Sequence, residues 1–258
     1  MSYFGNVDFY AEVAKGNVPG HSLVHKYGRN KSNTSGNEAS VNELGVMQFP
    51  AAASTMRIKA GGHANDTAAG SGAREVTIYG LDGSGNEISE AVATAGASAS
   101  AATTASFLRD YRGRVTQAGT YITTSIDTTG DNQGDIVIED SSGTNDYLTI
   151  PIHEGTTEYA GYHVALGTTA YLIGANIDVD ASKSADVIIY QRQSILDSTA
   201  PVQSRRVVLY FDGVAGHIPF QPKSPITFPA LTDIWWNHVP SANNTECAVD
   251  FELLIVEA

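Results

Sequence analysis

Residues 74–92 read Arg-Glu-Val-Thr-Ile-Tyr-Gly-Leu-Asp-Gly-Ser-Gly-Asn-Glu-Ile-Ser-Glu-Ala-Val, and this stretch decides the fold class. In residues 74–81 the side chains alternate between polar and apolar, as in a strand that buries one face. Residues 82–86 are turn formers, and residues 87–92 resume the strand pattern. The stretch therefore predicts a β-hairpin.

Similar short strands separated by Gly, Asp, Asn and Pro follow along the chain. No window of 12 or more residues shows a helical period with caps, although a short helical turn is possible near residues 8–15. Many short strands of this kind predict an all-β fold, an antiparallel β-sandwich of jelly-roll type. The further strands are expected at 55–60, 106–115, 119–124, 135–139, 146–150, 159–164, 169–173, 177–179, 187–192, 206–211, 233–238 and 247–256.

Residues 1–45 differ from the rest and predict an extended N-terminal arm, with the sandwich over residues 46–258. Two smaller sandwiches, divided near residues 116–129, are the alternative. The arm is either a disordered terminus or a segment that orders on a neighbouring subunit. We favour the second, in which the arm's aromatic side chains act as anchors: Tyr3, Phe4, Phe9 and Tyr10.

The charge of the chain is low and unevenly placed. Only 17% of the 258 residues are charged, and the net charge is −13. Residues 115–182 carry ten acids and no Lys or Arg, whereas residues 1–114 are neutral. This balance argues against binding to nucleic acid, which needs basic side chains. The acidic segment is a solvated face, or it binds a cation or a basic partner.

A Gly-rich loop in the acidic segment is the best candidate metal site. Its carboxylates Asp127, Asp131 and Asp135 are oxygen ligands of the kind that calcium takes from flexible loops. The spacing is not that of an EF-hand, so an exposed polar turn is the favoured interpretation. We expect no other cofactor. Asp178 and Asp180 would share a strand face, which suggests either a carboxylate pair or a wet surface, with the wet surface favoured.

Adjacent tryptophans and a pair of arginines are candidate contact residues. Trp235 and Trp236 would point to opposite faces of a strand, one into the core and one outward or at a subunit interface. An outward tryptophan could also stack on a sugar. Arg112 and Arg114 can share a face and pair with acidic surfaces of neighbours. Cys247 lies in an alternating run and is expected in the core.

Catalytic and targeting motifs are missing from the sequence. There is no phosphate-binding loop and no G-x-S-x-G, and the seven histidines form no metal-binding pattern. The N-terminus lacks the features of a secretory signal, and the uncharged run 91–108 is too polar to cross a membrane. We therefore expect a protein that is not an enzyme and is made in a cytoplasm.

Several segments together resemble virion structural proteins of tailed bacteriophages. They are Arg57-Ile58, residues 66–82, Glu87-Ile-Ser-Glu90, Phe107-Leu-Arg109 and Leu231-Thr-Asp-Ile234. The resemblance covers residues 50–258 and rests on a pattern of hydrophobic residues and glycines without a catalytic motif. It implies a β-rich, oligomeric particle component and transfers no functional residues.

The resemblance and the composition lead to one preferred function. We expect a homotrimeric capsid cement (decoration) protein on the capsid exterior, whose partners are its own copies and the major capsid protein. A tail, neck or head-fibre component is the alternative within this class. A carbohydrate-binding module and a glycan hydrolase or lyase are the alternatives from other classes.

Overall fold

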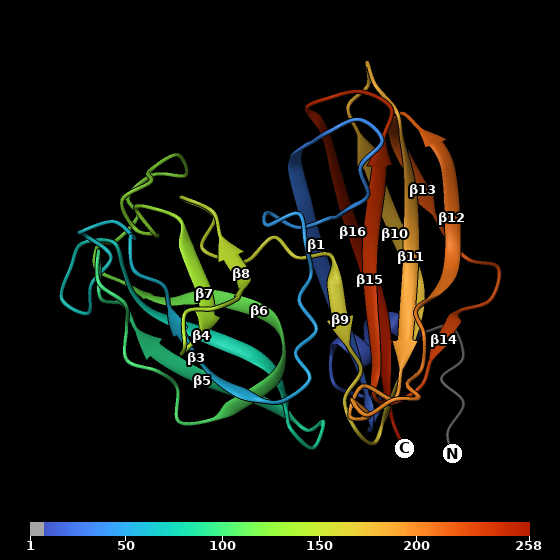
Figure 1. Cartoon of the computed structure of the whole chain (residues 1–258), viewed down its shortest axis with the longest axis horizontal. Helices are drawn as coiled ribbons and strands as arrows, with labels where there is room; N and C mark the ends of the chain where they lie inside the picture. Colours follow the sequence, from blue (N-terminus) through green and yellow to red (C-terminus); the bar gives the residue numbers. More distant parts are fainter. Residues whose placement is uncertain (1–7) are drawn as a thin grey trace.

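The computed structural model describes residues 8–258 and is built almost entirely of antiparallel strands (Figure 1). The strands form two packed units, a large sandwich and a smaller unit beside it. The expected all-β antiparallel sandwich is therefore confirmed. One short helix, α1 (Phe9–Ala14), begins after Asp8, whose side chain accepts a hydrogen bond from the Tyr10 N–H and caps the helix.

The large sandwich has two sheets. The first has the order β1-β16-β10-β13, with β14 also paired to β10. The second has the order β12-β11-β15-β2, with β9 also paired to β15. The bounds in the first sheet are β1 His21–Asn33, β10 Thr168–Val179, β13 Gly216–Phe220, β14 Ile226–Phe228 and β16 Thr245–Glu257. In the second they are β2 Ala39–Ser40, β9 Gly161–His163, β11 Ala185–Gln193, β12 Arg206–Val214 and β15 Thr232–Pro240.

Alternation along the central strands builds the core of the large sandwich. In β16 every second residue from Cys247 to Ile255 is buried. These side chains meet Trp236 of β15 and Val187 and Ile189 of β11 from the opposite sheet. Cys247 is fully buried, as expected from the sequence.

The smaller unit is inserted between β2 and β9. Its six strands have the order β5-β4-β6-β3-β7-β8. Their bounds are β3 Ser54–Ile58, β4 Ala73–Asp82, β5 Glu87–Ala93, β6 Ser106–Ala118, β7 Ile136–Asp140 and β8 Asp146–Ile150. The predicted hairpin is β4 and β5, in which Val76 faces Val92 across the ladder.

The second core joins the two units. Inward residues of the smaller unit, such as Ile78 and Ile138, share one buried cluster with Tyr190 and Trp235 of the large sandwich. The outer face of the β12-β11-β15 sheet is thus partly covered by the inserted unit. Within the large sandwich, β1 passes close to the segment before β9: a Cβ at Gly28 would lie 2.0 Å from the Ala160 nitrogen.

Three expectations from the sequence differ from the structure. Residues 21–33 of the expected arm form β1, which pairs with β16 from His21 to Asn33. Asn and Lys residues are frequent in β1, so its sequence does not indicate a strand. Its strand conformation depends on the hydrogen bonds that it makes with β16. Residues 119–124 form no strand, because they have no neighbour to pair with. The division near 116–129 is also absent, since β6 and β7 belong to one sheet.

Candidate functional site

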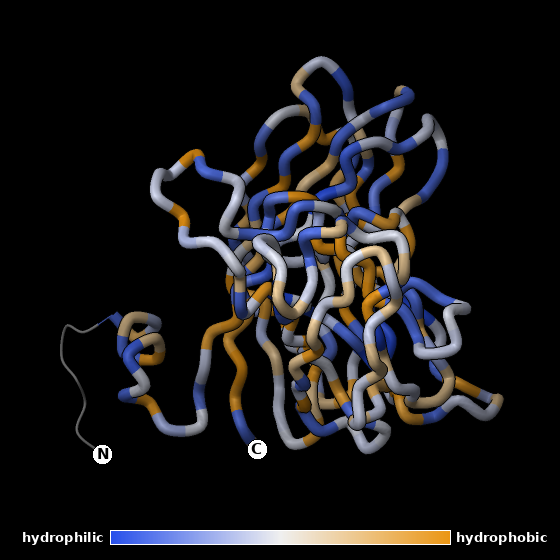
Figure 2. The backbone as a smooth tube through the Cα atoms, turned by 90° about the vertical axis from the view of Figure 1, so that its left-hand side faces the viewer, coloured by the Kyte–Doolittle hydropathy of each residue, from blue (hydrophilic) through white to orange (hydrophobic). Residues whose placement is uncertain are grey.

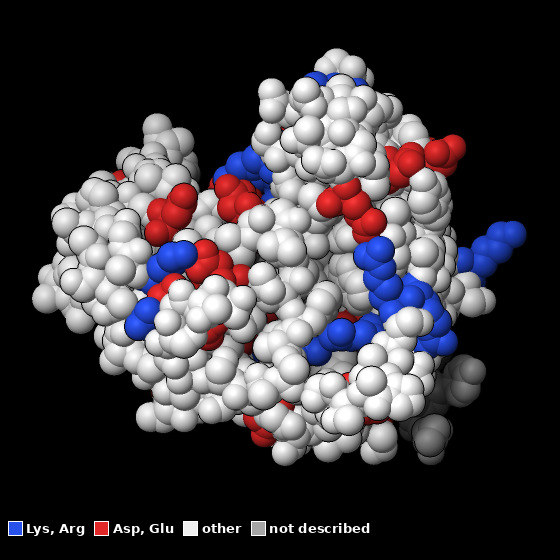
Figure 3. Space-filling model, viewed as in Figure 1, with Lys and Arg blue, Asp and Glu red and all other residues white. Residues whose placement is uncertain are grey.

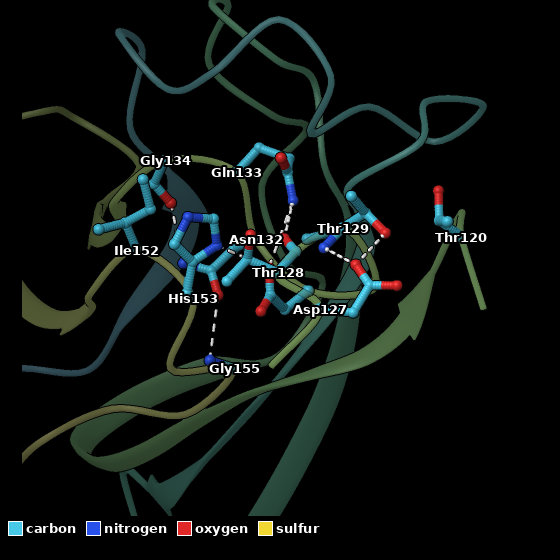
Figure 4. A network of polar contacts seen from close by, with 12 residues as sticks. Thr120, Asp127, Thr128, Thr129, Asn132, Gln133, Gly134, Ile152, His153 and Gly155 are labelled. Carbon is cyan, nitrogen blue, oxygen red and sulfur yellow. Dashed lines mark hydrogen bonds and ion pairs between the residues drawn. The ribbon is translucent and has the colours of Figure 1, made fainter. Parts of the chain in front are cut away.

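The acidic loop uses its carboxylates to hold its own shape (Figure 4). Asp127 accepts hydrogen bonds from the hydroxyl and N–H groups of Thr129 and Thr123. These bonds, led by the Thr129 hydroxyl, lower the pKa of Asp127 to about 2. Asp131 contacts the His153 Nδ1 at 3.0 Å and accepts from the Gln133 amide. Asp135 accepts from the Ile152 N–H.

The three aspartates therefore have different partners and are not gathered around one point. Within residues 8–258 no group of three or more His, Cys, Asp or Glu side chains could hold a metal ion. The structure does not bring together the calcium site expected at Asp127, Asp131 and Asp135. Its interpretation as a polar turn fits the observed hydrogen bonds.

Buried groups behind the loop fix its base. The Asp66 carboxylate accepts from the backbone N–H groups of Ala73, Gln133 and Gly134. Asn132 is fully buried and donates to the carbonyls of Gly134 and Pro151. At the other end of the loop the Gly119 N–H donates to the Gly72 carbonyl at 2.8 Å, so both ends are tied to the smaller unit.

The outer part of this loop carries exposed apolar side chains, of which Tyr121 and Ile122 lie in the strand expected at residues 119–124. Tyr121 is 86% exposed and Ile126 is 88% exposed, and Ile122 is 45% exposed. Figure 2 shows the loop projecting from the smaller unit as a pale segment with two short hydrophobic stretches. Large apolar side chains at this exposure commonly mark a contact surface when they occur together.

The N-terminal aromatic residues are only partly described. Tyr3 and Phe4 lie outside the described residues. Phe9 and Tyr10 are 46% and 39% exposed on α1, and their rings meet edge to face. Phe9 also packs against His21 at the start of β1. An anchoring role for these residues on a neighbouring subunit stays a prediction.

The tryptophan pair differs from its expected placement, because both side chains are buried. Trp236 is in the core of the large sandwich and Trp235 is in the core at the junction, with exposed fractions of 0% and 4%. The two rings do point to opposite faces of β15, but the inserted unit covers the second face. Neither ring is exposed enough to stack on a sugar, although Trp235 lines a surface groove beside Phe49.

The expected arginine pair lies in β6 beside β1. Arg112 is half-buried and donates to the His25 carbonyl at 2.5 Å, whereas Arg114 is exposed. Burial and the charge of Arg114 lower the pKa of Arg112. Together with Lys26 these arginines line a hollow of about 110 Å³. The hollow is basic but small.

A buried charge network at the junction was missed by the sequence analysis. Asp233 of β15 is fully buried and binds Arg109 of β6 at 2.8 Å, His163 of β9 at 2.8 Å and Arg192 of β11 at 2.6 Å. Burial acts to raise the pKa of Asp233, but His163 and Arg109 outweigh it and hold the pKa well below its ordinary value. The network ties the smaller unit to the second sheet.

The network resembles a catalytic arrangement, but its Tyr and His side chains are not accessible to solvent. The Tyr159 hydroxyl lies 3.2 Å from His163 Nε2, and His163 Nδ1 contacts Asp233. However, Tyr159 and His163 are 3% and 0% exposed. Burial raises the pKa of the Tyr159 phenol well above its ordinary value and lowers that of His163. Because solvent and substrate cannot reach Tyr159 and His163, we assign these side chains a structural role in holding the junction together.

Two further ionisable groups are buried near the network. Both oxygens of Asp110 lack a hydrogen-bond partner, and burial raises its pKa to about 7. Lys26 donates to the Tyr111 carbonyl and lies over the rings of Tyr111 and Tyr159. Burial, assisted by Arg112 and Arg114, lowers the pKa of Lys26 well below its ordinary value. Unpaired buried charge of this kind lowers stability.

A groove opens at the surface next to the network. Its volume is about 420 Å³, and its lining includes Met47, Phe49 and Trp235 on the apolar side and Arg192 and Arg205 on the polar side. No acidic residue lines it. A smaller hollow of about 160 Å³ continues from it past Phe49 and Arg192. Figure 3 shows Lys and Arg gathered over the end of β11 and the start of β12.

The carboxylates Asp178 and Asp180 do not form a pair in a cleft. Asp178 is exposed and contacts His217 at 2.8 Å, and Asp180 contacts Lys183 and the Glu246 N–H. This arrangement matches the wet-face interpretation of the sequence. In residues 8–258 no helix is long and apolar enough to span a membrane.

Comparisons with known proteins give weak structural neighbours only. No protein-family model and no curated protein matches the chain. The VP2 subviral particle of infectious bursal disease virus is similar at 12% identity, with a TM-score of 0.25, over 92% of this chain and 72% of that one. The Gx strain of the same virus gives 12% identity, a TM-score of 0.27 and the same coverage. These values are too low to carry an argument about family or function.

Proposed function

We propose that the chain is a structural component of a virus particle that acts by binding copies of itself and neighbouring shell proteins. The observation that carries the proposal is the projecting loop, on which Tyr121 and Ile126 are almost fully exposed. Exposed apolar groups on a fixed support are suited to macromolecular contacts. The low charged fraction of 17% supports a surface made for such contacts.

The specific role that we propose is a homotrimeric capsid cement protein on the capsid exterior, bound to the major capsid protein. It rests on the sequence resemblance to virion proteins of tailed bacteriophages. A tail, neck or head-fibre component has the same support. The carbohydrate-binding alternative has lost its main support, because both tryptophans are buried.

The test is binding of the purified protein to capsids assembled from the major capsid protein alone. Co-sedimentation is expected for the wild type, together with a higher temperature of disassembly of the capsids. Absence of binding contradicts the cement role, and localisation to the tail by particle reconstruction supports the alternative. Deletion of residues 2–40 is unsuitable as a test of the arm, because it removes β1. Substitution of Phe9 and Tyr10 by serine is the appropriate variant.

A further inference from the structure

We infer that the projecting loop of one copy, residues 119–131, docks in the groove beside Phe49 and Arg192 of a second copy. The inference deepens the proposed function, since it rests on the self-association proposed above and names the surfaces that make it. It joins two features that nothing else in the described chain uses. One is an exposed apolar loop and the other is an open groove with an apolar floor.

The loop offers apolar groups with negative charge beside them. Tyr121 and Ile126 are 86% and 88% exposed, and Asp127 follows directly. The hydrogen bonds from Thr129 and Thr123 keep Asp127 ionised at neutral pH. No Lys or Arg occurs between residues 115 and 182, so all charged side chains of the loop itself are acidic.

The groove offers the complementary chemistry. Its apolar floor is made by Met47, Phe49 and Trp235, and its rim carries Arg192 and Arg205. The Arg205 side chain is 57% exposed and pairs with Glu38 Oε1 at 3.4 Å, so a docking carboxylate would share this arginine with Glu38. The volume of about 420 Å³ falls in the range of ordinary binding pockets and has room for an apolar side chain.

Other hollows of the molecule fit the loop less well. The hollow beside Arg112 and Arg114 is basic, but it is narrow, at about 110 Å³, and Tyr27 is the one aromatic residue in its lining. The hollow beside β10 and β13 contains Asp250 and Glu252, which would repel Asp127. The groove beside Phe49 combines volume, apolar floor and positive charge.

The loop and the groove are different surfaces, and we infer a heterologous contact in which the loop of each copy enters the groove of the next copy. Each copy keeps a free loop at one end and a free groove at the other, so copies join head to tail into rings or filaments. In a two-fold dimer, by contrast, two copies would exchange loops reciprocally and assembly would stop at two. The size of the assemblies therefore distinguishes a head-to-tail contact from a two-fold contact.

The first test is the self-association of the purified full chain, measured by sedimentation over a range of concentrations. The double variant Tyr121→Ser/Ile126→Ser is expected to weaken association by about thirtyfold or more, as for loss of a contact centre. The variant Val207→Ser is the matched control, because Val207 is 56% exposed on the edge strand β12. Circular dichroism verifies that each variant is folded.

The second test reverses one charge on the groove. Arg205→Glu is expected to weaken association at least tenfold, whereas Arg206→Glu is expected to leave it unchanged. Arg206 is the neighbouring exposed arginine and does not line the groove. Association of the wild type should also weaken with added salt.

The third test mixes the two inactive variants. The loop variant keeps its groove and the Arg205→Glu variant keeps its loop, so the mixture should form one-to-one dimers that grow no further. A monomeric wild type, association that survives in both variants, or a mixture that stays monomeric overturns the inference. If the chain associates as inferred but is absent from particles, the inference holds and the virion function fails. If a monomeric chain binds particles, the virion function holds and the inference fails.

Discussion

Replacing Asp110 with asparagine should make the protein more stable at pH 8 and change little at pH 4. Asp110 is 4% exposed, and both of its oxygens lack a hydrogen-bond partner. Burial raises its pKa in the folded state from the ordinary value of 3.8 to about 7. The folded protein therefore binds this proton more tightly than the unfolded chain does.

The sign and size of the effect follow from proton linkage. The contribution of Asp110 to stability is greatest below about pH 4, where its side chain is protonated in both states, and it falls as the pH rises towards 7. A difference of about three pH units between the two pKa values corresponds to about 4 kcal/mol at pH 8, at about 1.4 kcal/mol per unit. Asparagine has nearly the same shape and no charge, so it escapes this penalty.

Urea unfolding of the wild type and Asp110→Asn at pH 4, 6 and 8 measures the effect. The difference between the two proteins should increase with pH by up to about 4 kcal/mol, because all other groups titrate alike in both. Glu252→Gln, at an exposed position of β16, is the control and should stay within about 0.5 kcal/mol at every pH. A difference that does not depend on pH refutes the argument that Asp110 is buried without a partner.

Three further predictions concern stability. Arg109→Met removes one partner of the buried Asp233 and should cost about 3–5 kcal/mol in urea unfolding, whereas Arg206→Met should cost less than about 0.5 kcal/mol; equal effects contradict the ion network. Gly28→Ala should prevent folding at 37 °C, because its Cβ would lie 2.0 Å from a backbone nitrogen, while Gly174→Ala, with only one neighbour at 3.8 Å, should remain folded by circular dichroism. Asp66→Ala leaves buried N–H groups without an acceptor, so limited proteolysis should cut residues 119–135 faster than in the wild type; unchanged cleavage means that Asp66 does not tether the loop.

Alternation of side chains was sufficient to predict the strands with one buried face. The hairpin of β4 and β5 and the long last strand β16 follow directly from their sequences. Strand β1 was missed because Lys26, Asn30 and the residues around them look like loop residues. Their burial comes from contacts with distant segments, such as the Tyr111 carbonyl for Lys26 and the Ser40 carbonyl for Asn30.

The junction network could not be predicted because its members are far apart in the sequence. Arg109, His163, Arg192 and Asp233 belong to four different strands. Each alone is a polar residue that a half-exposed strand could place in solvent. The pairing of β15 with β9 and β11 places Asp233 beside His163 and Arg192, and the inserted unit adds Arg109 and excludes water. The loop at residues 119–124 shows the opposite case, since its β-forming residues find no neighbouring strand.

The two faces of β15 connect the fold to the proposed assembly. Trp236 points into the large sandwich and Trp235 points into the junction, so one strand stabilises both cores. Asp233 on the same strand binds Arg109 of the smaller unit. These contacts hold the smaller unit at a fixed orientation. The projecting loop belongs to that unit, and the groove lies against Phe49 and Trp235 at the junction. The angle between loop and groove sets whether a head-to-tail series of copies closes into a ring or continues as a filament. A buried ion network that fixes this angle therefore contributes to assembly geometry even where its net contribution to stability is small.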